Sequence, residues 1–232
     1  MESKKVSILH HITNDVASNL QAQVTELMGS IPIMGNSSLD AHEIAHVSSG
    51  LVLNLGMPNP DKLKAIKKTV PVYEGKNKPI VLDPVGISMS DSRKEMALNI
   101  LKNKKISVVK GNTNEIQSLT KNYSKEDFSK NYNTVLVTTG KTIEITHSSK
   151  SKSYKMPESK IQKLPGTGCI LGTLIGCLIL RGFAPYDAST RAAFMMKKVA
   201  EKITSSLPYG KIQEVLLNEL EVLSNENLLN NK

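Results

Sequence analysis

The chain has no tryptophan, only two cysteines and no long apolar segment. Cys169 and Cys177 lie eight residues apart in one apolar run, where a helix would place them two turns from each other and beyond disulfide reach. We therefore expect no disulfide framework of the kind found in secreted domains. The longest apolar run, Cys169 to Leu180, has 12 residues, whereas a membrane-spanning helix needs about 20. Because the first thirty residues also show no signal-peptide pattern, we expect a cytoplasmic protein.

Aromatic side chains are scarce, while lysine gives the chain a formal net charge of +9. A positive excess can indicate a polyanionic partner. The lysines are nevertheless scattered over predicted helices and turns, without the neighbouring aromatic residues that stack on nucleic-acid bases. We therefore interpret the charge as a solvated basic surface and expect neither a nucleic acid nor a membrane as a partner.

Short apolar runs alternate with helical stretches along most of the chain, which predicts an α/β fold with a mostly parallel central sheet flanked by helices on both faces. All but the first of the predicted strands are near-continuous apolar runs, as is typical of strands that are covered on both sides. These strands are Val6 to Ile12, Leu51 to Leu55, Pro79 to Leu82, Ile106 to Val109 and Thr134 to Thr138. The predicted helices among them are Ala17 to Met28, Ser38 to Ser48, Asp61 to Thr69, Asp91 to Lys102 and Thr113 to Thr120.

The last third of the chain departs from this alternation. Thr142 to Thr146 and Ser153 to Met156 predict an antiparallel hairpin. From Gly166 onward the pattern is helical, with Asp187 expected to cap a helix that ends at Ser205 and a final helix over Tyr209 to Leu229. Nothing in the composition marks a boundary, so we expect a single domain over residues 1–232, with a frayed tail after about residue 224.

The strongest local motif is Pro165-Gly166-Thr167-Gly168-Cys169, which directly precedes an apolar helix. Glycines allow backbone amides to point into one concavity, and the helix N-terminus adds positive charge, so the motif predicts a cradle for a transferring phosphoryl group. An isolated Gly-x-Gly is equally typical of a tight turn. Cys169 lies in the first helical turn, where we expect the helix dipole to lower its pKa. The thiolate would then accept a proton or only line the pocket. The alternative is that Cys169 is a small buried hydrophobic residue.

Polar residues follow three predicted strands at the points where the strands end. Ligands of open parallel sheets bind beyond these carboxyl ends. Two carboxylates suit Mg²⁺, which is held by one or two protein carboxylates and by substrate phosphates, and a lysine suits phosphate oxygens. Taken singly, Asp83 is equally well explained as a turn residue and Glu115 as a charge in a first helical turn. The strand-end residues are Asp83, Lys110, Asn112, Glu115, Thr139 and Gly140.

Seven short motifs occur in a fixed order along the chain. They are ITN at Ile12 to Asn14, PIM at Pro32 to Met34, LVLNLG at Leu51 to Gly56, VLDPVG at Val81 to Gly86, KGNTNEI at Lys110 to Ile116, TTG at Thr138 to Gly140 and PGTGC at Pro165 to Cys169. In this order, over roughly residues 6 to 205, the series resembles the hydroxyethylthiazole kinase family. The resemblance implies a ribokinase-like fold and an ATP-dependent kinase for the primary hydroxyl of 4-methyl-5-(2-hydroxyethyl)thiazole in thiamine salvage. It also implies Mg²⁺ and a homotrimer with the thiazole pocket between subunits.

The resemblance further implies a role for individual residues. The catalytic group comprises Cys169 with the loop residues Gly166, Thr167 and Gly168. The residues implied at ATP and its phosphates are Lys110, in place of the family's usual arginine, with Asn112, Glu115, Thr139 and Gly140. Asp83 and Glu115 match the magnesium region, and Asn14, Met34 and Gly166 match thiazole-side positions. On their own, Asn14 is an ordinary helix cap and Met34 a core residue.

Two other functions remain open from the sequence. One is a hydroxymethylpyrimidine kinase or another small-alcohol kinase of the same fold. The other is a non-catalytic protein that binds the thiazole or a nucleotide, which the departures from the family pattern favour. These departures include the short segment before the first strand, the lysine at position 110 and Pro71, which is expected to break a helix and shorten that crossover.

Overall fold

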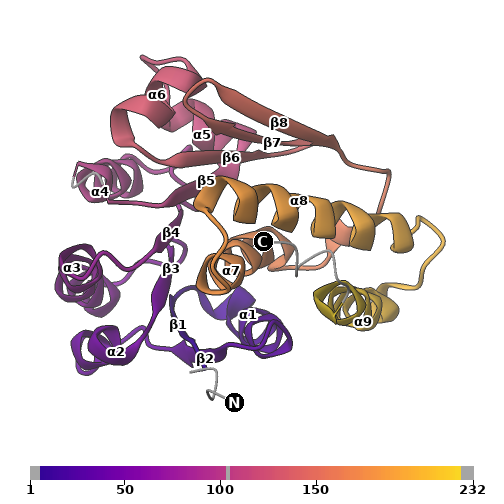
Figure 1. The fold of residues 1–232 in the computed structure, drawn as a ribbon, viewed down its shortest axis with the longest axis horizontal. Helices are drawn as coiled ribbons and strands as arrows, with labels where there is room; N and C mark the ends of the chain where they lie inside the picture. Colours follow the sequence, from indigo (N-terminus) through magenta and orange to yellow (C-terminus); the bar gives the residue numbers. More distant parts are fainter. Residues whose placement is uncertain (1–5, 103–104, 226–232) are drawn as a thin grey trace.

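The computed structural model describes residues 6–102 and 105–225, which form one eight-stranded sheet in the order β2-β1-β3-β4-β5-β6-β7-β8 (Figure 1). The strands from β2 to β6 pair in parallel, and β7 and β8 are antiparallel. The strands are β1 (Ile8–Ile12), β2 (Ile31–Met34), β3 (Gly50–Asn54), β4 (Ile80–Asp83), β5 (Val108–Asn112), β6 (Val135–Thr139), β7 (Thr142–His147) and β8 (Lys150–Lys155). The mostly parallel α/β fold is thus confirmed.

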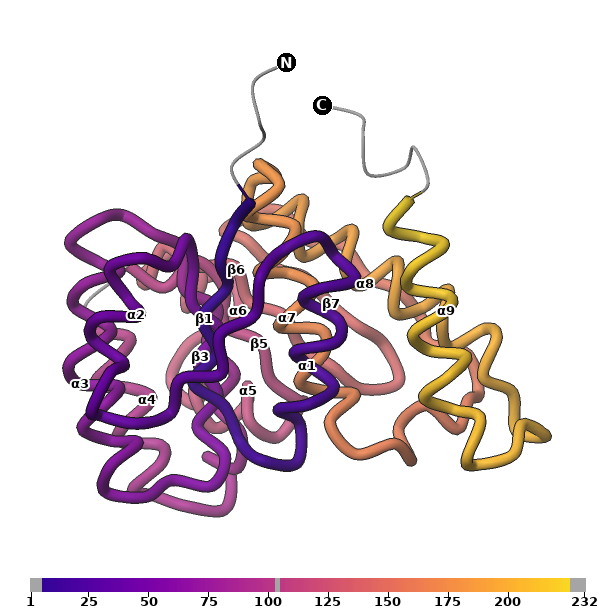
Figure 2. The backbone as a smooth tube through the Cα atoms, turned by 90° about the horizontal axis from the view of Figure 1, so that it is seen from below, coloured from indigo at the N-terminus to yellow at the C-terminus, as the bar shows by residue number. Residues whose placement is uncertain are grey.

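Helices cover both faces of the sheet (Figures 1 and 2). One face carries α1 (Asp15–Leu27), α7 (Thr167–Leu180), α8 (Pro185–Lys202) and α9 (Ile212–Asn225). The other carries α2 (Ala41–Val47), α3 (Pro60–Gly75), α4 (Asp91–Leu101), α5 (Thr113–Leu119) and α6 (Lys125–Tyr132). Two short 3₁₀ turns, η1 (Ile161–Lys163) and η2 (Tyr209–Lys211), precede α7 and α9. Within these described residues, no helix is long and apolar enough to cross a membrane.

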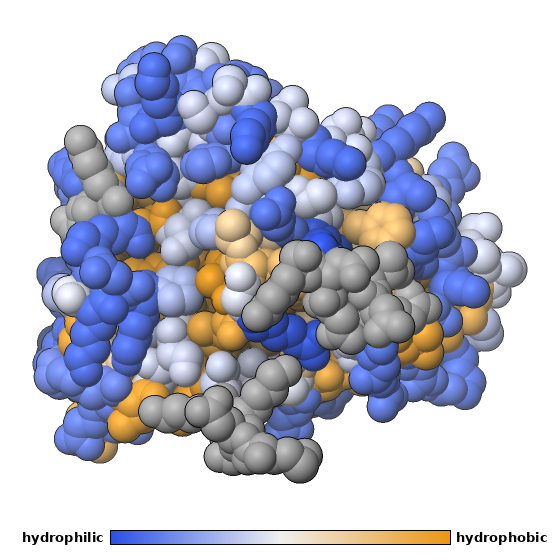
Figure 3. Space-filling model, viewed as in Figure 1, coloured by the Kyte–Doolittle hydropathy of each residue, from blue (hydrophilic) through white to orange (hydrophobic). Residues whose placement is uncertain are grey.

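Each face of the sheet has its own hydrophobic core. Every residue of β3 and β4 is buried, and successive side chains point to opposite faces: Val52 joins the core under α7, and Leu51 and Leu53 join the core under α3. Gly176 lets α7 approach the sheet closely, since a Cβ there would lie 3.2 Å from Val52. The face shown in Figure 3 is hydrophilic over much of its outer part and has hydrophobic residues toward its centre.

The strand register aligns the polar strand ends at one edge of the sheet. Asn54 of β3 lies opposite Asp83 of β4, and Asn112 of β5 lies opposite Thr139 of β6. The loops that carry the predicted site residues therefore meet at this edge, as expected for parallel strands.

Two elements of the structure were not predicted from the sequence. The strand β2 has four residues, includes a proline and is mostly half-buried at the sheet edge, so it has no apolar alternation to detect. The helix α6 is short and mostly polar, and it is anchored to the core by Phe128. Both elements owe their stability to tertiary packing, which local propensity does not report.

The prediction that Pro71 breaks its helix is wrong, because α3 continues through it to Gly75. Pro71 lies on the exposed side of α3, while Val70 and Tyr73 are buried in the core on its other side. The burial of these two side chains offsets the hydrogen bond that proline removes.

The C-terminal helices also differ in detail from the prediction. Pro185 occupies the first turn of α8 after Ala184, so Asp187 is an acidic first-turn residue rather than the cap, and the helix ends at Lys202 instead of Ser205. The helix α9 ends at Asn225, and the predicted extension to Leu229 lies outside the described residues. The hairpin β7–β8 is confirmed, with a tighter turn in which Ser148 has a φ of 53°.

Candidate active site

A buried ion pair marks the centre of the polar edge of the sheet. Lys110 Nζ lies 3.0 Å from Asp83 Oδ2 at the end of β4, and both side chains are almost fully buried. Because β5 continues to Asn112, Lys110 lies in the middle of this strand and not beyond its end as predicted. Burial raises the pKa of Asp83 above its usual value, although Lys110 opposes this shift. Burial alone would lower the pKa of Lys110, but the charge and the hydrogen bond of Asp83, together with smaller contributions from other neighbours, outweigh burial and the pKa is raised. Lys110 therefore remains a cation at this edge.

Two asparagines connect this ion pair to Cys169. The side-chain amide of Asn54 donates to Asp83 Oδ2 at 3.1 Å and lies 3.3 Å from Cys169 Sγ. The amide of Asn14 donates to Asn54 Oδ1 at 3.1 Å and lies 3.8 Å from the same sulfur. Residues from the loop after β1, from the strands β3, β4 and β5 and from the start of α7 thus form one connected polar cluster.

The expected lowering of the Cys169 pKa is wrong. Burial, and next the charge of Asp83, raise the pKa of this thiol to about 11, although Lys110 and the two asparagine amides pull it down. Desolvation is the largest of these effects, although the residue as a whole is only half-buried. Cys169 is therefore a neutral thiol at physiological pH, which favours the pocket-lining alternative over the proton acceptor.

The glycine loop forms a cradle above the ion pair. Gly166 has a φ of 87°, and a Cβ there would lie 3.2 Å from Ala17 Cα, so the loop requires glycine at this position. A Cβ on Gly168 would lie 3.8 Å from Lys110 Nζ, which places the first turn of α7 beside the cation. Thr167 fixes the turn by donating its hydroxyl to Leu164 O at 3.0 Å. The helix N-terminus and Lys110 together provide positive charge for an anion.

Glu115 orders the neighbouring loops and does not contact the ion pair directly. Its Oε1 accepts a hydrogen bond from the Gly86 amide at 2.9 Å, and its Oε2 accepts one from the Asn112 amide at 2.8 Å. Asn112 in turn caps α5 by accepting from the Glu115 amide at 3.0 Å, which completes a capping box. Glu115 therefore fixes the loop after β4 against the start of α5.

One oxygen of Asp83 is suited to bind a magnesium ion. Asp83 Oδ1 is buried and has no hydrogen-bond partner in the described residues, so it is free to bind a cation or a metal-bound water. No group of three metal-binding side chains occurs in that part of the chain. This agrees with the preference of Mg²⁺ for one or two carboxylates supplemented by water and phosphate oxygens.

A cavity of about 780 Å³ opens beside the glycine loop. Its size is typical of small-molecule and cofactor sites. Apolar side chains from β7, η1, α7 and α8 form part of its wall. Five residues that were predicted for the catalytic loop or for the nucleotide also line it: Asn112, Thr139, Gly140, Thr167 and Gly168.

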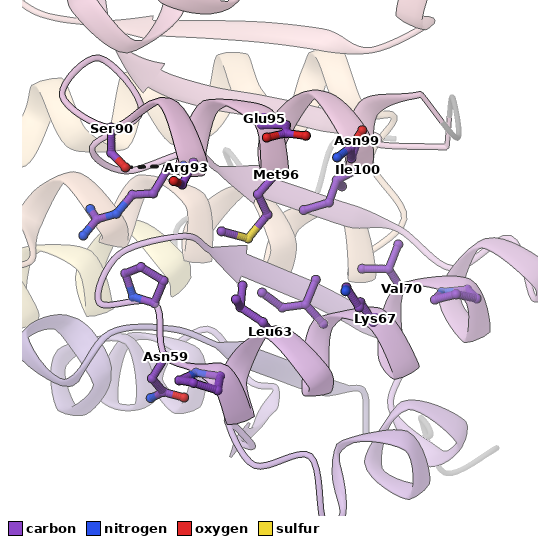
Figure 4. A pocket seen from close by; sticks show the side chains of 15 residues that line it. Asn59, Leu63, Lys67, Val70, Ser90, Arg93, Glu95, Met96, Asn99 and Ile100 are labelled. Carbon is purple, nitrogen blue, oxygen red and sulfur yellow. Dashed lines mark hydrogen bonds between the residues drawn. The ribbon is translucent and has the colours of Figure 1, made fainter.

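Met34 lies on the edge strand β2, which β1 separates from the strands that carry Asn54 and Asp83. It ends β2 opposite His11 of β1 and is half-buried at the same edge of the sheet. A second cavity of about 630 Å³ lies between α3 and α4, where Leu63, Met96 and Ile100 form an apolar floor (Figure 4). None of the predicted site residues lines that groove.

Asn54 and Gln21 were missed as site residues. Asn54 ends β3 but lies inside the predicted strand Leu51 to Leu55, so the rule that selected polar residues after predicted strands did not find it. Gln21 is fully buried in α1, where its amide donates to Thr173 Oγ1 at 3.1 Å and to Cys169 O at 3.4 Å. A glutamine within a helix gives no such signal in a sequence.

The fold and the site together define a ribokinase-like small-molecule kinase, in which a glycine loop at a helix N-terminus faces an acid at the end of one strand and a lysine within the next strand. The family model for the hydroxyethylthiazole kinase family matches residues 3–226, and the chain belongs to this family. It is 31% identical to a hydroxyethylthiazole kinase of Clostridium perfringens strain 13, with 93% of this chain and 86% of the relative covered. A hydroxyethylthiazole kinase of Exiguobacterium sibiricum is 26% identical, with 97% and 94% covered.

Solved structures support the same fold. The hydroxyethylthiazole kinase protein of Pyrococcus horikoshii OT3 superposes with a TM-score of 0.83 at 24% identity, over 97% of this chain and 91% of that one. A pyridoxal kinase of Staphylococcus aureus, solved with AMP-PCP and pyridoxal, superposes with a TM-score of 0.65 at 14% identity, over 85% and 89% of the two chains. The ribokinase-like architecture is therefore shared well beyond the range of clear sequence similarity.

Proposed function

We propose that this protein transfers the γ-phosphoryl group of ATP to the primary hydroxyl of 4-methyl-5-(2-hydroxyethyl)thiazole, a step of thiamine salvage. The observation that carries the proposal is the convergence of Asp83, Lys110 and Cys169 at the N-terminus of α7, beside a cavity of about 780 Å³. Membership of the hydroxyethylthiazole kinase family supports the acceptor. We treat residues 1–232 as one kinase domain, because both hydrophobic cores share a single sheet.

The site performs the reaction mainly by orienting the reactants and by stabilising charge. The phosphates of ATP would lie between the first turn of α7 and Lys110, with Asn112, Thr139 and Gly140 lining the nucleotide cavity. The acceptor hydroxyl would approach in line from the side of Asn14, Met34 and Gly166. Phosphoryl transfer passes through a loose transition state, so no thiolate base is needed. The hydroxyl oxygen would bond to the γ-phosphorus as the bond to ADP breaks, and the hydroxyl proton would pass to an oxygen of the transferred phosphoryl group. A neutral Cys169 thiol would contact the hydroxyl.

Mg²⁺ is the metal that suits this donor set. Asp83 would hold it through Oδ1, directly or through water, and Glu115 would keep the adjoining loop in place. When bound, the metal would neutralise the charge of the phosphate oxygens during transfer.

The acceptor side of the site is exposed in a single chain, which supports the proposed homotrimer. Four large hydrophobic side chains lie in the loops or first turns that follow β1, β2, β3 and β4, around the acceptor end of the cluster. Their exposed fractions are 63% for Val16, 89% for Leu39, 49% for Met57 and 91% for Met89. A second subunit that covered this edge would bury them and close the thiazole pocket. A reaction that uses ATP, in a chain with two free cysteines, suits the cytoplasm.

An acceptor panel tests the proposed function. Purified protein is assayed for ADP release with ATP, Mg²⁺ and, separately, the hydroxyethylthiazole, hydroxymethylpyrimidine and pyridoxal. We expect release that depends on the thiazole alcohol and exceeds that with the other acceptors. Preference for another alcohol would replace the acceptor, whereas calorimetric binding of the thiazole without any turnover would replace the kinase by a binding protein.

A further inference from the structure

The first turn of α3 contains a buried lysine that the reaction described above does not use. Lys62 is 3% exposed, and its Nζ donates to Gly56 O at 2.6 Å and to Thr13 O at 2.8 Å. No carboxylate of the described residues lies within ion-pair distance of this amine. An ammonium that is buried against carbonyl oxygens alone is costly, so its retention needs a reason.

The two carbonyl groups belong to the loops that carry the acceptor-side asparagines. Thr13 directly precedes Asn14, and the Gly56 amide donates to Asn54 Oδ1 at 2.8 Å. A Cβ on Gly56 would lie only 2.9 Å from that oxygen, so the loop packs tightly around Asn54. Lys62 thereby joins the loop after β1 to the loop after β3, immediately behind the two amides that approach the thiol.

We propose that Lys62 is a positioning residue for phosphoryl transfer. Its ammonium clamps the two loops together and so holds the amides of Asn14 and Asn54 in place. Those amides in turn set the position of Asp83 and of the Cys169 thiol, where the acceptor hydroxyl reacts. This inference rests on the proposed kinase activity and adds a residue that acts on its acceptor side.

The charges around Lys62 make the clamp sensitive to pH. Burial lowers the pKa of Lys62 from 10.5 to about 8. Asp15 of α1 favours the charged form, and Arg93 of α4 disfavours it. Because a neutral amine is a weaker donor than an ammonium, the clamp is tight below pH 8 and loosens as the pH rises through that value.

An exposed lysine elsewhere on α3 provides the control. Leu63, Lys67 and Val70 face the groove between α3 and α4, whereas Lys62 is not among the residues that line it (Figure 4). Lys64 is an exposed lysine on the same helix, two residues further on. Lys64→Met therefore removes the same charge from α3 without touching either loop.

The test compares Lys62→Met, Lys62→Arg and Lys64→Met with the unmodified protein, in steady-state kinetics from acidic to alkaline pH. For Lys62→Met we expect kcat/KM for the thiazole alcohol to fall roughly ten- to a hundredfold, while the KM for ATP and the result for Lys64→Met stay unchanged. In the unmodified protein, kcat/KM for the acceptor should decline above pH 8. Lys62→Arg, whose charge does not titrate in this range, should lose that decline and keep more activity than Lys62→Met.

A double-mutant cycle tests whether Lys62 acts through the side-chain amide of Asn14. Asn14→Ser keeps a capping oxygen for α1 but removes the amide, so adding Lys62→Met to it should cost less than Lys62→Met costs alone. Unchanged acceptor kinetics in Lys62→Met would overturn the proposal. So would an equal loss of kcat/KM for both substrates that came with a lower melting temperature and an unchanged pH profile. If Lys62→Met does not fold, the pH profile of Lys62→Arg decides. Absence of thiazole turnover in the unmodified protein would instead contradict the proposed acceptor.

Discussion

At the scale of single residues, Cys169 shows how burial changes the chemistry that a motif suggests. The sequence places this cysteine in the first turn of a helix, where a dipole favours the thiolate. In the structure, burial and the nearby Asp83 raise its pKa to about 11. The side chain therefore contributes contacts and shape to the site, and the proton of the acceptor is not taken up by a pre-formed thiolate.

Substitution of Cys169 tests this view. We expect Cys169→Ser to keep most of the activity, because a hydroxyl also accepts from the two asparagine amides. Cys169→Ala should lower kcat/KM for the acceptor by roughly three- to tenfold, the cost of about one hydrogen bond. Since the thiol stays protonated up to about pH 11, activity should show no rise between pH 6 and 8 that depends on the cysteine. Such a rise, lost in Cys169→Ser, would show that the thiolate takes part.

The strand-end rule predicted much of the site but not its internal connections. Asp83, Lys110 and Thr139 follow apolar runs, so their shared edge was visible in the sequence. The ion pair itself and the bridge through Asn54 depend on register and side-chain direction. The burial of Lys62 could not be predicted from the sequence either, because lysines in amphipathic helices are ordinarily exposed.

At the scale of elements, the strands buried on both faces were predicted, whereas an edge strand and a polar helix were not. Apolar runs gave β3, β4, β5 and β6 to within a few residues, and the apolar helix α7 followed from its composition. Edge strand β2 and polar helix α6 are held by their neighbours instead of by local propensity. Local rules likewise failed at Pro71, where tertiary packing prevails over a helix breaker.

Pro71 offers a test of that packing argument. Pro71→Ala should raise the free energy of unfolding by about 1 to 3 kcal/mol, because alanine restores a helical hydrogen bond on the exposed side of α3. Pro60→Ala is the matched control, since proline at the first position of the same helix removes no internal bond. Urea unfolding at equilibrium measures both, and an equal effect of the two substitutions would contradict the argument.

The glycine loop can be tested against a second glycine of positive φ. Gly166→Ala should cost about 1 to 2 kcal/mol for the left-handed backbone, and more because the added methyl would meet Ala17 of α1. Gly182 has a φ of 99°, and a Cβ there would have no other atom within 4 Å, so Gly182→Ala bears only the backbone cost. Thermal and urea unfolding should rank Gly166→Ala as clearly less stable, and only this variant should weaken thiazole binding. Equal stability of the two variants would remove the steric argument.

At the scale of the whole molecule, the exposed hydrophobic residues at the acceptor edge predict an assembly. Leu39→Glu combined with Met89→Glu should shift the mass measured by sedimentation from three chains towards one. It should also weaken binding of the thiazole alcohol but not of ATP, because the cavity that we propose for the nucleotide is lined by residues of one chain. Val222→Glu, an equally apolar exposed site on α9, should change neither property. A monomeric unmodified protein that still turns over the thiazole would contradict the assembly.

The most direct test of the whole account removes the acid at the centre of the cluster. Formation of phosphorylated thiazole and ADP is followed by mass spectrometry for the unmodified protein, for Asp83→Asn and for Asp83→Asn with Lys110→Met, which leaves no buried unpaired cation. In the unmodified protein we expect equimolar amounts of the two products. In both variants we expect folded protein and a loss of at least about a hundredfold in kcat. Undiminished product formation by folded Asp83→Asn would contradict the placement of phosphoryl transfer at this cluster.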